Sequence, residues 1–295
     1  MNWNQVGTGD ESKPQTVDEW GCVWSRTEVR NMGQVTGHPL LEWSALDRYT
    51  WPDADDPVLY EGMEQQLQDA DQKFVMTRIF MLLFERMCSL RGFSNALVDL
   101  ALEDPRIEAL ADRIVEFDLT IINNISRRFP GQIHALYFTD DWGTERSTLI
   151  SPRLWQDFFQ ARYQCLFDAI HEAGWFVWMH SCGQISAIVD LLIKTGVDVL
   201  NLQQPRVLDL RAFGQRFAGR VCFESLCDIQ ATLPFLGKDQ IEEEARLLVQ
   251  HWGTPQGGFI LGNYGDSEAI GVPMIKKRWM LDAFLAADRR SDHDR

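Results

Sequence analysis

The chain has 295 residues, enough for two average domains or one large α/β barrel, and its net charge at pH 7 is −15. This charge argues against a nucleic-acid partner or an anionic membrane, because like charges repel. Its six cysteines lie far apart, unlike those of a small secreted disulfide scaffold, and no secretion signal or long apolar membrane span is recognisable. We therefore expect a cytoplasmic protein with reduced thiols.

Regular elements are sparse at the start of the chain and frequent after it. Residues 4–7 and 22–26 are weak strand candidates, and a clearer strand at 73–80 precedes helices at 92–101 and 104–128. Beyond residue 130, short apolar runs alternate with longer amphipathic stretches. They predict strands at 133–138, 175–179, 198–202, 220–224 and 257–261, and helices at 152–173, 184–195, 207–217, 238–251 and 274–287. This alternation is typical of βα units around a parallel sheet.

Two architectures fit such units, and a missing motif favours one of them. An open doubly wound sheet usually carries a glycine-rich phosphate loop, but the sequence contains no G-x-G-x-x-G or G-x-x-x-x-G-K-[ST] motif. Six strands can be placed, and eight would close a barrel. We predict an α/β fold, a single-domain (β/α)8 TIM barrel over residues 1–288. Its N-terminal part is shortened or irregular, and residues 289–295 form a charged tail.

Polar residues gather at the carboxyl ends of the predicted strands, where barrel enzymes carry their chemistry. They are Asp140, Asp141, His180, Cys182, Asn201, Gln203, Glu224, Cys227, Asn263, Tyr264 and Asp266. The amino ends of the same strands carry mainly glycines and helix caps. This concentration favours an enzyme over a purely structural barrel. Asn201, Gln203, Tyr264 and Trp142 are the expected substrate contacts.

His180 and Cys182 form an H-x-C pair directly after a predicted strand. Imidazole nitrogen and thiolate sulfur are preferred ligands of Zn²⁺, and a catalytic zinc site has three protein ligands and an open position. Gly183 would let the backbone approach closely. The alternative is a histidine held by a neighbouring carboxylate beside a cysteine that packs as a small core residue. The candidates for a third ligand are Cys227 and Glu224.

Asp140 and Asp141 are adjacent carboxylates, which point to opposite sides in an extended chain, so we expect one of them to face the barrel mouth. That carboxylate would act as a general acid or base or bind a cation. The alternative is that one of the two caps the loop before Ser151. Residues 18–21 (D-E-W-G) repeat the acidic-Trp-Gly pattern of the later segment, and they bring Asp18 in as a further candidate carboxylate.

Several segments together resemble the uroporphyrinogen decarboxylase superfamily. They are D-E-W-G-C-V-W at 18–24, F-E-R…L-R-G-F at 84–93, F-T-D-D-W-G-T at 138–144, S-P-x-L-W…I-H-E-A-G at 151–174, H-S-C-G at 180–183, G-V-D-V-L-N at 196–201 and a C-terminal G-G-F-I-L. Their order and spacing match over roughly residues 15 to 285. The resemblance implies a (β/α)8 barrel.

The superfamily has two branches, and this sequence departs from both. The decarboxylases hold a tetrapyrrole with N-terminal arginines and use an aspartate near the position of Asp18, but that arginine motif is absent and the chain is expected to begin some tens of residues late. The cobamide-dependent methyltransferases bind Zn²⁺ through an H-x-C pair and a distant cysteine, and H-S-C-G and D-D-W-G resemble this branch. Tyr264 stands at the place of that cysteine, and its ordinary pKa of ~10 makes it a poor ligand.

Three functions follow from the residues and the resemblance. The first is a zinc-dependent methyltransferase with His180, Cys182 and Cys227 as ligands. It would exchange a methyl group between a small molecule and a corrinoid on a partner protein, with Asp140 or Asp141 positioning the substrate. The second is a cofactor-free decarboxylase of uroporphyrinogen or a smaller acid that uses Asp18. The third is a non-catalytic barrel that binds a corrinoid or a tetrapyrrole. A homodimer is compatible with each.

Overall fold

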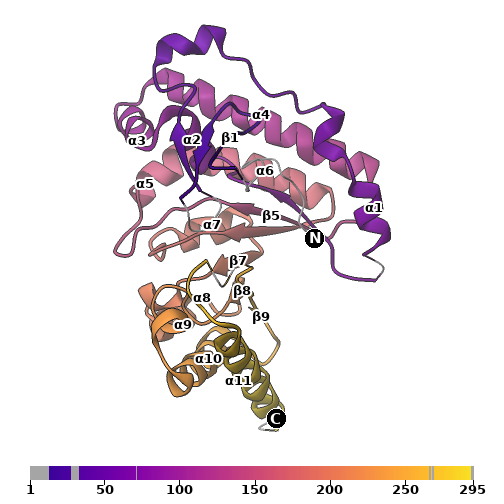
Figure 1. Cartoon of the computed structure of the whole chain (residues 1–295), viewed down its shortest axis with the longest axis vertical. Coiled ribbons are helices and arrows are strands. Elements are labelled where there is room, and N and C mark those ends of the chain that lie inside the picture. Colours follow the sequence, from indigo (N-terminus) through magenta and orange to yellow (C-terminus); the bar gives the residue numbers. More distant parts are fainter. Residues whose placement is uncertain (1–12, 28–32, 71, 266, 268, 294–295) are drawn as a thin grey trace. The chain divides into compact units, whose positions relative to one another are not determined.

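The computed structural model describes residues 13–27, 33–70, 72–265, 267 and 269–293, and the chain divides into two compact units (Figure 1). The first unit comprises Met1–Asp140 and Gln156–Val177, and the second comprises Asp141–Trp155 and Trp178–Arg295. One unit boundary therefore falls between the adjacent carboxylates Asp140 and Asp141. The single-domain organisation of residues 1–288 stays a prediction.

The first unit begins with a small antiparallel sheet. Its strands β1 (Gln15–Val17), β2 (Val23–Ser25) and β3 (Gln34–Gly37) pair in the order β1-β2-β3. The expected strand at 22–26 is thus present as β2, whereas residues 4–7 lie outside the described residues. Three short helical segments follow, namely η1 (Trp43–Arg48), η2 (Pro57–Tyr60) and α1 (Met63–Gln68).

Two parallel strands and four helices complete the first unit. Strand β4 (Met76–Ile79) pairs in parallel with β5 (Ala135–Thr139), and the helices are α2 (Phe84–Arg91), α3 (Phe93–Ala101), α4 (Pro105–Arg128) and α6 (Gln160–Glu172). Asp104 caps α4 by accepting from the amide of Arg106, and Pro105 occupies the first helical position, where no amide hydrogen is needed. Helix α4 packs on α6. The buried Phe138 of β5 contacts Phe167 of α6 and marks the helix-covered face of the sheet.

Parallel strands alternate with helices through the second unit. The segments in chain order are α5 (Pro152–Leu154), the π-turn η3 (Trp155–Phe159), β6 (Phe176–His180), α7 (Val189–Thr195), β7 (Val199–Leu202), η4 (Pro205–Val207), α8 (Leu210–Phe217), β8 (Cys222–Ser225), α9 (Thr232–Phe235), α10 (Lys238–Trp252), β9 (Phe259–Leu261) and α11 (Met274–His293). Unit boundaries fall at the start of η3 and within β6. From Trp178 onward β6 pairs with β7, which pairs with β8, which pairs with β9, all in parallel.

The two faces of this sheet differ in chemistry. Met179, Leu200 and Phe223 are fully buried, and Phe223 packs against Trp252 of α10, so this face is the helix-covered core. Side chains alternate along a strand, so the residues that follow them point to the opposite face. There the register aligns His180 with Asn201 and Asn201 with Glu224, in one row across three strands.

Six parallel strands are present, as the sequence predicts, whereas the N-terminal strands form a separate antiparallel sheet. Within the described part of the chain no strand pairing closes the parallel strands into a barrel. The expected helix at 152–173 is interrupted by the π-turn, and the expected helix at 184–195 starts at Val189. The preceding residues instead form a loop in which the amide of Gln184 bonds to the carbonyl of Thr144. Helix α11 continues to His293, into the residues expected to form a charged tail.

None of the helices in the described residues combines the length and the apolar character that crossing a membrane requires.

Candidate metal site

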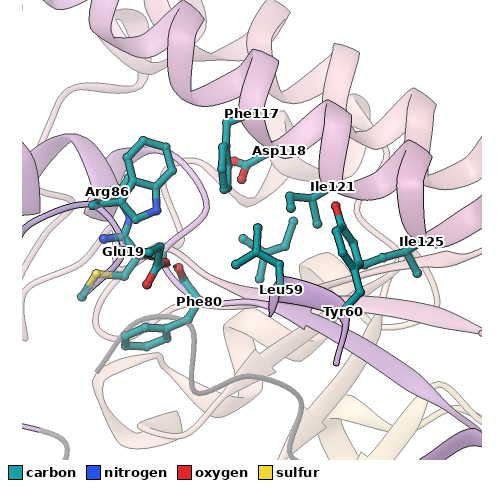
Figure 2. A pocket seen from close by; sticks show the side chains of 12 residues that line it. Glu19, Leu59, Tyr60, Phe80, Arg86, Phe117, Asp118, Ile121 and Ile125 are labelled. Atoms are coloured by element: carbon teal, nitrogen blue, oxygen red, sulfur yellow. Dashed lines mark hydrogen bonds and ion pairs between the residues drawn. The ribbon is translucent and has the colours of Figure 1, made fainter. Parts of the chain in front are cut away.

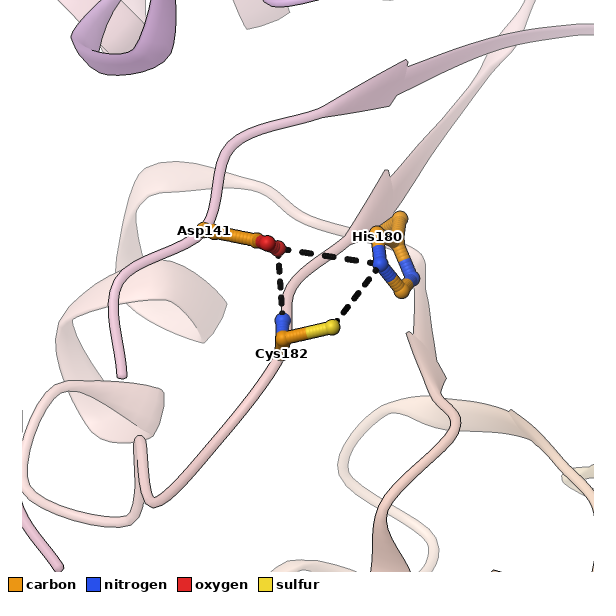
Figure 3. Close-up of side chains that lie close together, drawn as sticks. All are labelled: Asp141, His180 and Cys182. Carbon is orange, nitrogen blue, oxygen red and sulfur yellow. Dashed lines mark hydrogen bonds and ion pairs between the residues drawn. The ribbon is translucent and has the colours of Figure 1, made fainter. Parts of the chain in front are cut away.

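Three potential metal ligands from two loops of the second unit converge at one point (Figure 3). One ligand atom each of Asp141, His180 and Cys182 lies within 4.8 Å of the others. Nε2 of His180 is 3.4 Å from Sγ of Cys182 and 3.6 Å from Oδ1 of Asp141. His180 ends strand β6, Cys182 follows two residues later, and Asp141 follows the end of β5. The carboxyl ends of strands therefore supply all three side chains.

The ring of His180 is oriented by its neighbour on the next strand. Nδ1 lies 2.7 Å from the side-chain oxygen of Asn201. An amide oxygen only accepts hydrogen bonds, so Nδ1 carries the proton and the lone pair of a neutral ring is on Nε2. Nε2 is the nitrogen that faces Cys182 and Asp141. A second hydrogen-bonded partner that fixes the tautomer is a regular feature of metal-binding histidines.

The carboxylate of Asp141 is held in place by the loop that carries Cys182. Its Oδ1 accepts a hydrogen bond of 2.8 Å from the backbone amide of Cys182. The two loops are also tied by a bond from the Trp142 amide to the hydroxyl of Ser181 and by one from the Gln184 amide to the Thr144 carbonyl. The relative position of Asp141 and Cys182 is therefore determined mainly by backbone groups.

Two glycines permit this close approach of the loops. A Cβ atom on Gly183 would lie 2.4 Å from the backbone of Gly143, and one on Gly143 would lie 2.7 Å from the backbone of residues 182–184. Gly183 also has a φ of +81°, which strains other residues. Its amide donates to the side chain of Gln204. Gln204 and Ser181 were not among the sequence candidates; Gln204 directly follows the candidate Gln203, and position alone does not distinguish the two.

The chemistry of this donor set fits a zinc ion. Imidazole nitrogen, thiolate sulfur and carboxylate oxygen are the three ligand types that proteins use for Zn²⁺, and three protein ligands leave a fourth position for an incoming molecule. His180 is 9% exposed, while Asp141 and Cys182 are only half-buried, so the group is accessible from one side. These three residues could thus hold the ion and still admit a substrate.

The other two proposed metal ligands lie elsewhere in the second unit. Cys227 is fully buried, and its thiol donates to the carbonyl of Ile241 in α10. Burial raises the pKa of this thiol far above its ordinary value, which disfavours the thiolate that a metal needs. Glu224 is the penultimate residue of β8, two strands away from His180, and it accepts a 2.7 Å hydrogen bond from the indole of Trp178. The structure does not bring either residue into the group around His180.

Asp140 is completely buried in the first unit and has no access to solvent. Its carboxylate accepts hydrogen bonds from the amides of Leu83, Phe84 and Glu85 at the start of α2, and from the hydroxyl of Tyr163. Burial raises the pKa of Asp140 to about 6, although these hydrogen bonds oppose the shift. The arrangement satisfies free amides at a helix N-terminus and so makes Asp140 a structural residue of the first unit.

Asp18 is also embedded among donors in the first unit. It accepts from the amides of Trp20 and Cys22, from the indole of Trp24 and from the guanidinium of Arg86 at 2.9 Å. Its two oxygens therefore accept four hydrogen bonds from the protein, and these bonds stabilise the N-terminal segment.

The expected substrate contacts have different surroundings. Asn201 is buried beside His180, and Trp142 is fully buried, with its ring 6.1 Å from that of Trp155. Gln203 is half-buried, and its carbonyl accepts from the amide of Ile229. Tyr264 is half-buried in the segment after β9, where its carbonyl accepts from Lys277. Asn201 forms a direct hydrogen bond to His180 of the metal group.

A separate cavity lies in the first unit between β4, α4 and the N-terminal segments (Figure 2). Its volume is about 30 Å³, and its walls are mainly apolar, including Leu59, Ile79 and Ile121. Asp118 lines it with a side-chain oxygen that has no hydrogen-bond partner in the described residues. Burial raises the pKa of Asp118 well above its ordinary value, so the neutral acid is favoured. No sequence pattern indicated that Asp118 is buried, because an aspartate within a predicted helix looks the same in the sequence whether it is buried or exposed.

Comparison with known proteins agrees with this arrangement of parallel strands and helices. The family profile described as Uroporphyrinogen decarboxylase (URO-D) matches residues 32–283, and the chain belongs to this family. A methyltransferase from Methanosarcina mazei has a similar structure, with a TM-score of 0.64 and 16% sequence identity over 90% of this chain and 75% of that chain. At this identity the similarity establishes the fold alone. None of the curated proteins compared with the chain matches it in sequence.

Proposed function

We propose that the protein is a zinc-dependent methyltransferase of the uroporphyrinogen decarboxylase family. It would move a methyl group between a small molecule and a corrinoid carried by a partner protein, on a (β/α)8 barrel. The observation that carries the proposal is the convergence of Asp141, His180 and Cys182 within 4.8 Å. The fold shared with the Methanosarcina mazei methyltransferase is compatible with it.

A bound zinc ion would supply positive charge that lowers the pKa of a thiol and so creates the thiolate nucleophile that accepts a methyl group. The residues of this chain prepare the place for that chemistry. Asn201 keeps the proton of His180 on Nδ1, so that Nε2 is available for the ion. The amide of Cys182 holds Asp141 at the same point. Because Asp141 and Cys182 are half-buried, a substrate can approach the group from solvent.

The identity of the third ligand differs from the sequence hypothesis. We assign this role to Asp141, which the sequence suggested as a general acid or base, in place of Cys227 or Glu224. The resulting set has one sulfur, one nitrogen and one oxygen. It carries the same formal charge as a site with one histidine and two thiolates, but the carboxylate oxygen makes it a harder site.

Two measurements test the proposal. Protein purified without chelator should contain about one zinc per chain by elemental analysis, as expected for a single three-ligand site. It should demethylate free methylcobalamin in the presence of small thiols, and the change in corrinoid absorbance measures the rate of this reaction. Cys182→Ser and His180→Ala should lose both properties, while Cys165→Ser, which alters an exposed cysteine of α6, should keep both. Zinc at less than a tenth of an equivalent, or turnover that a chelator does not affect, would remove the basis of the proposal.

Decarboxylation of uroporphyrinogen or a smaller acid is the second candidate, supported by the family itself. The four hydrogen bonds to Asp18 weigh against it, because they leave the carboxylate no free oxygen for substrate. Release of CO₂ from uroporphyrinogen by the Cys182→Ser variant at the rate of the unaltered protein would favour this alternative over methyl transfer.

A further inference from the structure

One arginine of the first unit differs from the other buried arginines. Five arginines in the described residues are at least partly buried: Arg26, Arg78, Arg86, Arg91 and Arg162. Four of them donate hydrogen bonds, Arg26 to Thr16, Arg86 to Asp18, Arg91 to Asp99 and Arg162 to Asp112. Arg78 has no hydrogen bond or ion pair with any described residue, and its Nε is shut off from solvent without a partner.

This lack of a partner is unexpected in so acidic a chain. The sequence has 43 Asp and Glu residues against 28 Lys and Arg residues, so carboxylates are abundant. A half-buried guanidinium that is left unpaired loses hydration and regains nothing for it, which destabilises the folded state. A residue kept in such a place needs a reason other than stability, and a partner that arrives from solution is the simplest one.

Aromatic rings orient the guanidinium of Arg78. Its central carbon lies 5.2 Å from the ring centre of Phe80 and 5.8 Å from that of Tyr137. These contacts contribute cation–π attraction to the guanidinium. The edge that carries the N–H donors has no acceptor in the described part of the first unit. A planar, bidentate acceptor matches that edge.

The position of Arg78 in the sheet also suits a ligand. It belongs to β4, opposite Tyr137 of β5 in the parallel register. Tyr137 is followed by Phe138, which packs against α6, so Tyr137 and Arg78 point to the opposite face of the sheet. Arg78 lies in the carboxyl-terminal half of β4, the end at which parallel α/β proteins bind their ligands.

We propose that Arg78, with Phe80 and Tyr137 beside it, is a binding site for the carboxylate group of a small ligand. A carboxylate offers two coplanar oxygens to the guanidinium edge, and a ring attached to it would contact the neighbouring aromatic side chains. The site lies within the first unit and needs no metal. Its test is therefore independent of the proposed methyl transfer.

Binding of benzoate to the full-length protein as purified, measured by titration calorimetry, tests the site. Benzoate should bind, and benzamide, which has the same shape without the charge, should bind at least about tenfold more weakly. Uroporphyrin is added as a second carboxylate source. If it competes with benzoate, the site accepts a tetrapyrrole carboxylate; if it does not compete, the site accepts only a small acid. Inorganic phosphate that binds more tightly than benzoate would contradict the assignment of a carboxylate.

Variants of Arg78 separate a binding role from a structural one. Arg78→Gln should reduce benzoate affinity by at least about tenfold, and Arg78→Lys should restore part of it, because a lysine keeps the charge without the bidentate edge. Arg127→Gln, which removes the same charge from an exposed position of α4, should leave benzoate affinity unchanged. The thermal midpoint of Arg78→Gln should equal or exceed that of the unaltered protein. Benzoate binding that Arg78→Gln does not alter, or absence of benzoate binding by the unaltered protein, would overturn the proposal.

Discussion

Asp140 and Asp141 are neighbours in the chain, yet the two units use them in opposite ways. Asp140 is fully buried in the first unit, where three backbone amides and Tyr163 saturate its carboxylate. Asp141 is half-exposed in the second unit and accepts one backbone amide, while its Oδ1 faces His180 at 3.6 Å. A carboxylate whose oxygens already accept several hydrogen bonds from the protein stabilises the fold. A carboxylate with oxygen lone pairs still available can bind a ligand.

The same contrast separates the arginines of the first unit. Arg86 forms a buried ion pair with Asp18, while the side chain of Arg78 lies near two aromatic rings and has no hydrogen-bond acceptor among the described residues. Polar side chains whose hydrogen-bonding atoms are all paired stabilise the N-terminal segment and α2. Polar side chains with atoms still available for hydrogen bonds are the candidates for ligand binding.

The largest effect should come from exchanging the two aspartates for alanine. Asp140→Ala leaves buried donors without an acceptor and should lower the free energy of unfolding by about 3 to 5 kcal/mol. Asp141→Ala removes one partly exposed hydrogen bond and should lower it by about 1 kcal/mol, but it should abolish zinc binding. Denaturant unfolding and zinc content measure the two properties. Equal loss of stability in the two variants would erase the distinction between them.

A smaller effect is expected where the two metal-site loops touch. Gly183→Ala introduces strain at a φ of +81° and a contact of 2.4 Å with Gly143, and it should lower stability by about 2 to 3 kcal/mol and weaken metal binding. Gly257→Ala is the matched control, because its φ of +103° is also strained but no atom lies within 4 Å of the added Cβ. It should lose only about 1 kcal/mol and keep its metal affinity. The comparison fails if both variants bind metal equally.

The partner of His180 should matter for affinity more than for stability. Asn201→Ala removes the acceptor that fixes the tautomer and should weaken zinc binding by about 10- to 100-fold. Asn201→Asp keeps an acceptor in place and should retain most of the affinity. Competition with a chelator of known affinity gives both values. Full affinity in Asn201→Ala would show that the orientation of the ring has another source.

The smallest expected effect concerns the pH dependence of stability. The pKa of Asp140 rises from 3.8 to about 6 in the folded protein, so between these values the folded state binds a proton that the unfolded state has released. Its contribution therefore makes stability fall as pH rises from about 4 to about 6. Asp140→Asn should flatten this fall, whereas Asp168→Asn on the exposed face of α6 should leave the slope unchanged. An unchanged slope in Asp140→Asn would contradict the assigned shift.

The positions of the strands along the chain and of the H-x-C pair at a strand end could be predicted from the sequence, because apolar runs and strand ends are local features. It also indicated that one of two adjacent carboxylates would face the site. Which one does so depends on the amides of Leu83 to Glu85, and these come from a segment some 55 residues earlier. Local patterns do not contain that information.

Cys227 illustrates the complementary difficulty. Its place shortly after a strand end suggests a metal ligand. In the structure, however, Cys227 is buried against α10, where its thiol donates a hydrogen bond to the carbonyl of Ile241. Depth below the surface is a tertiary property, and neither residue type nor spacing encodes it. The sequence did not single out Arg78 for the same reason, since only the packed structure reveals that its side chain forms no ion pair with a described residue.

X-ray absorption spectroscopy at the zinc edge of the zinc-loaded protein tests the central claim most directly. We expect one sulfur ligand at about 2.3 Å and the remaining nitrogen and oxygen ligands at about 2.0 to 2.2 Å. Two sulfur ligands would show that Cys227 moves into the site, and a shell without sulfur would show that Cys182 is not a ligand. Either of these spectra would contradict the assignment of Asp141, His180 and Cys182.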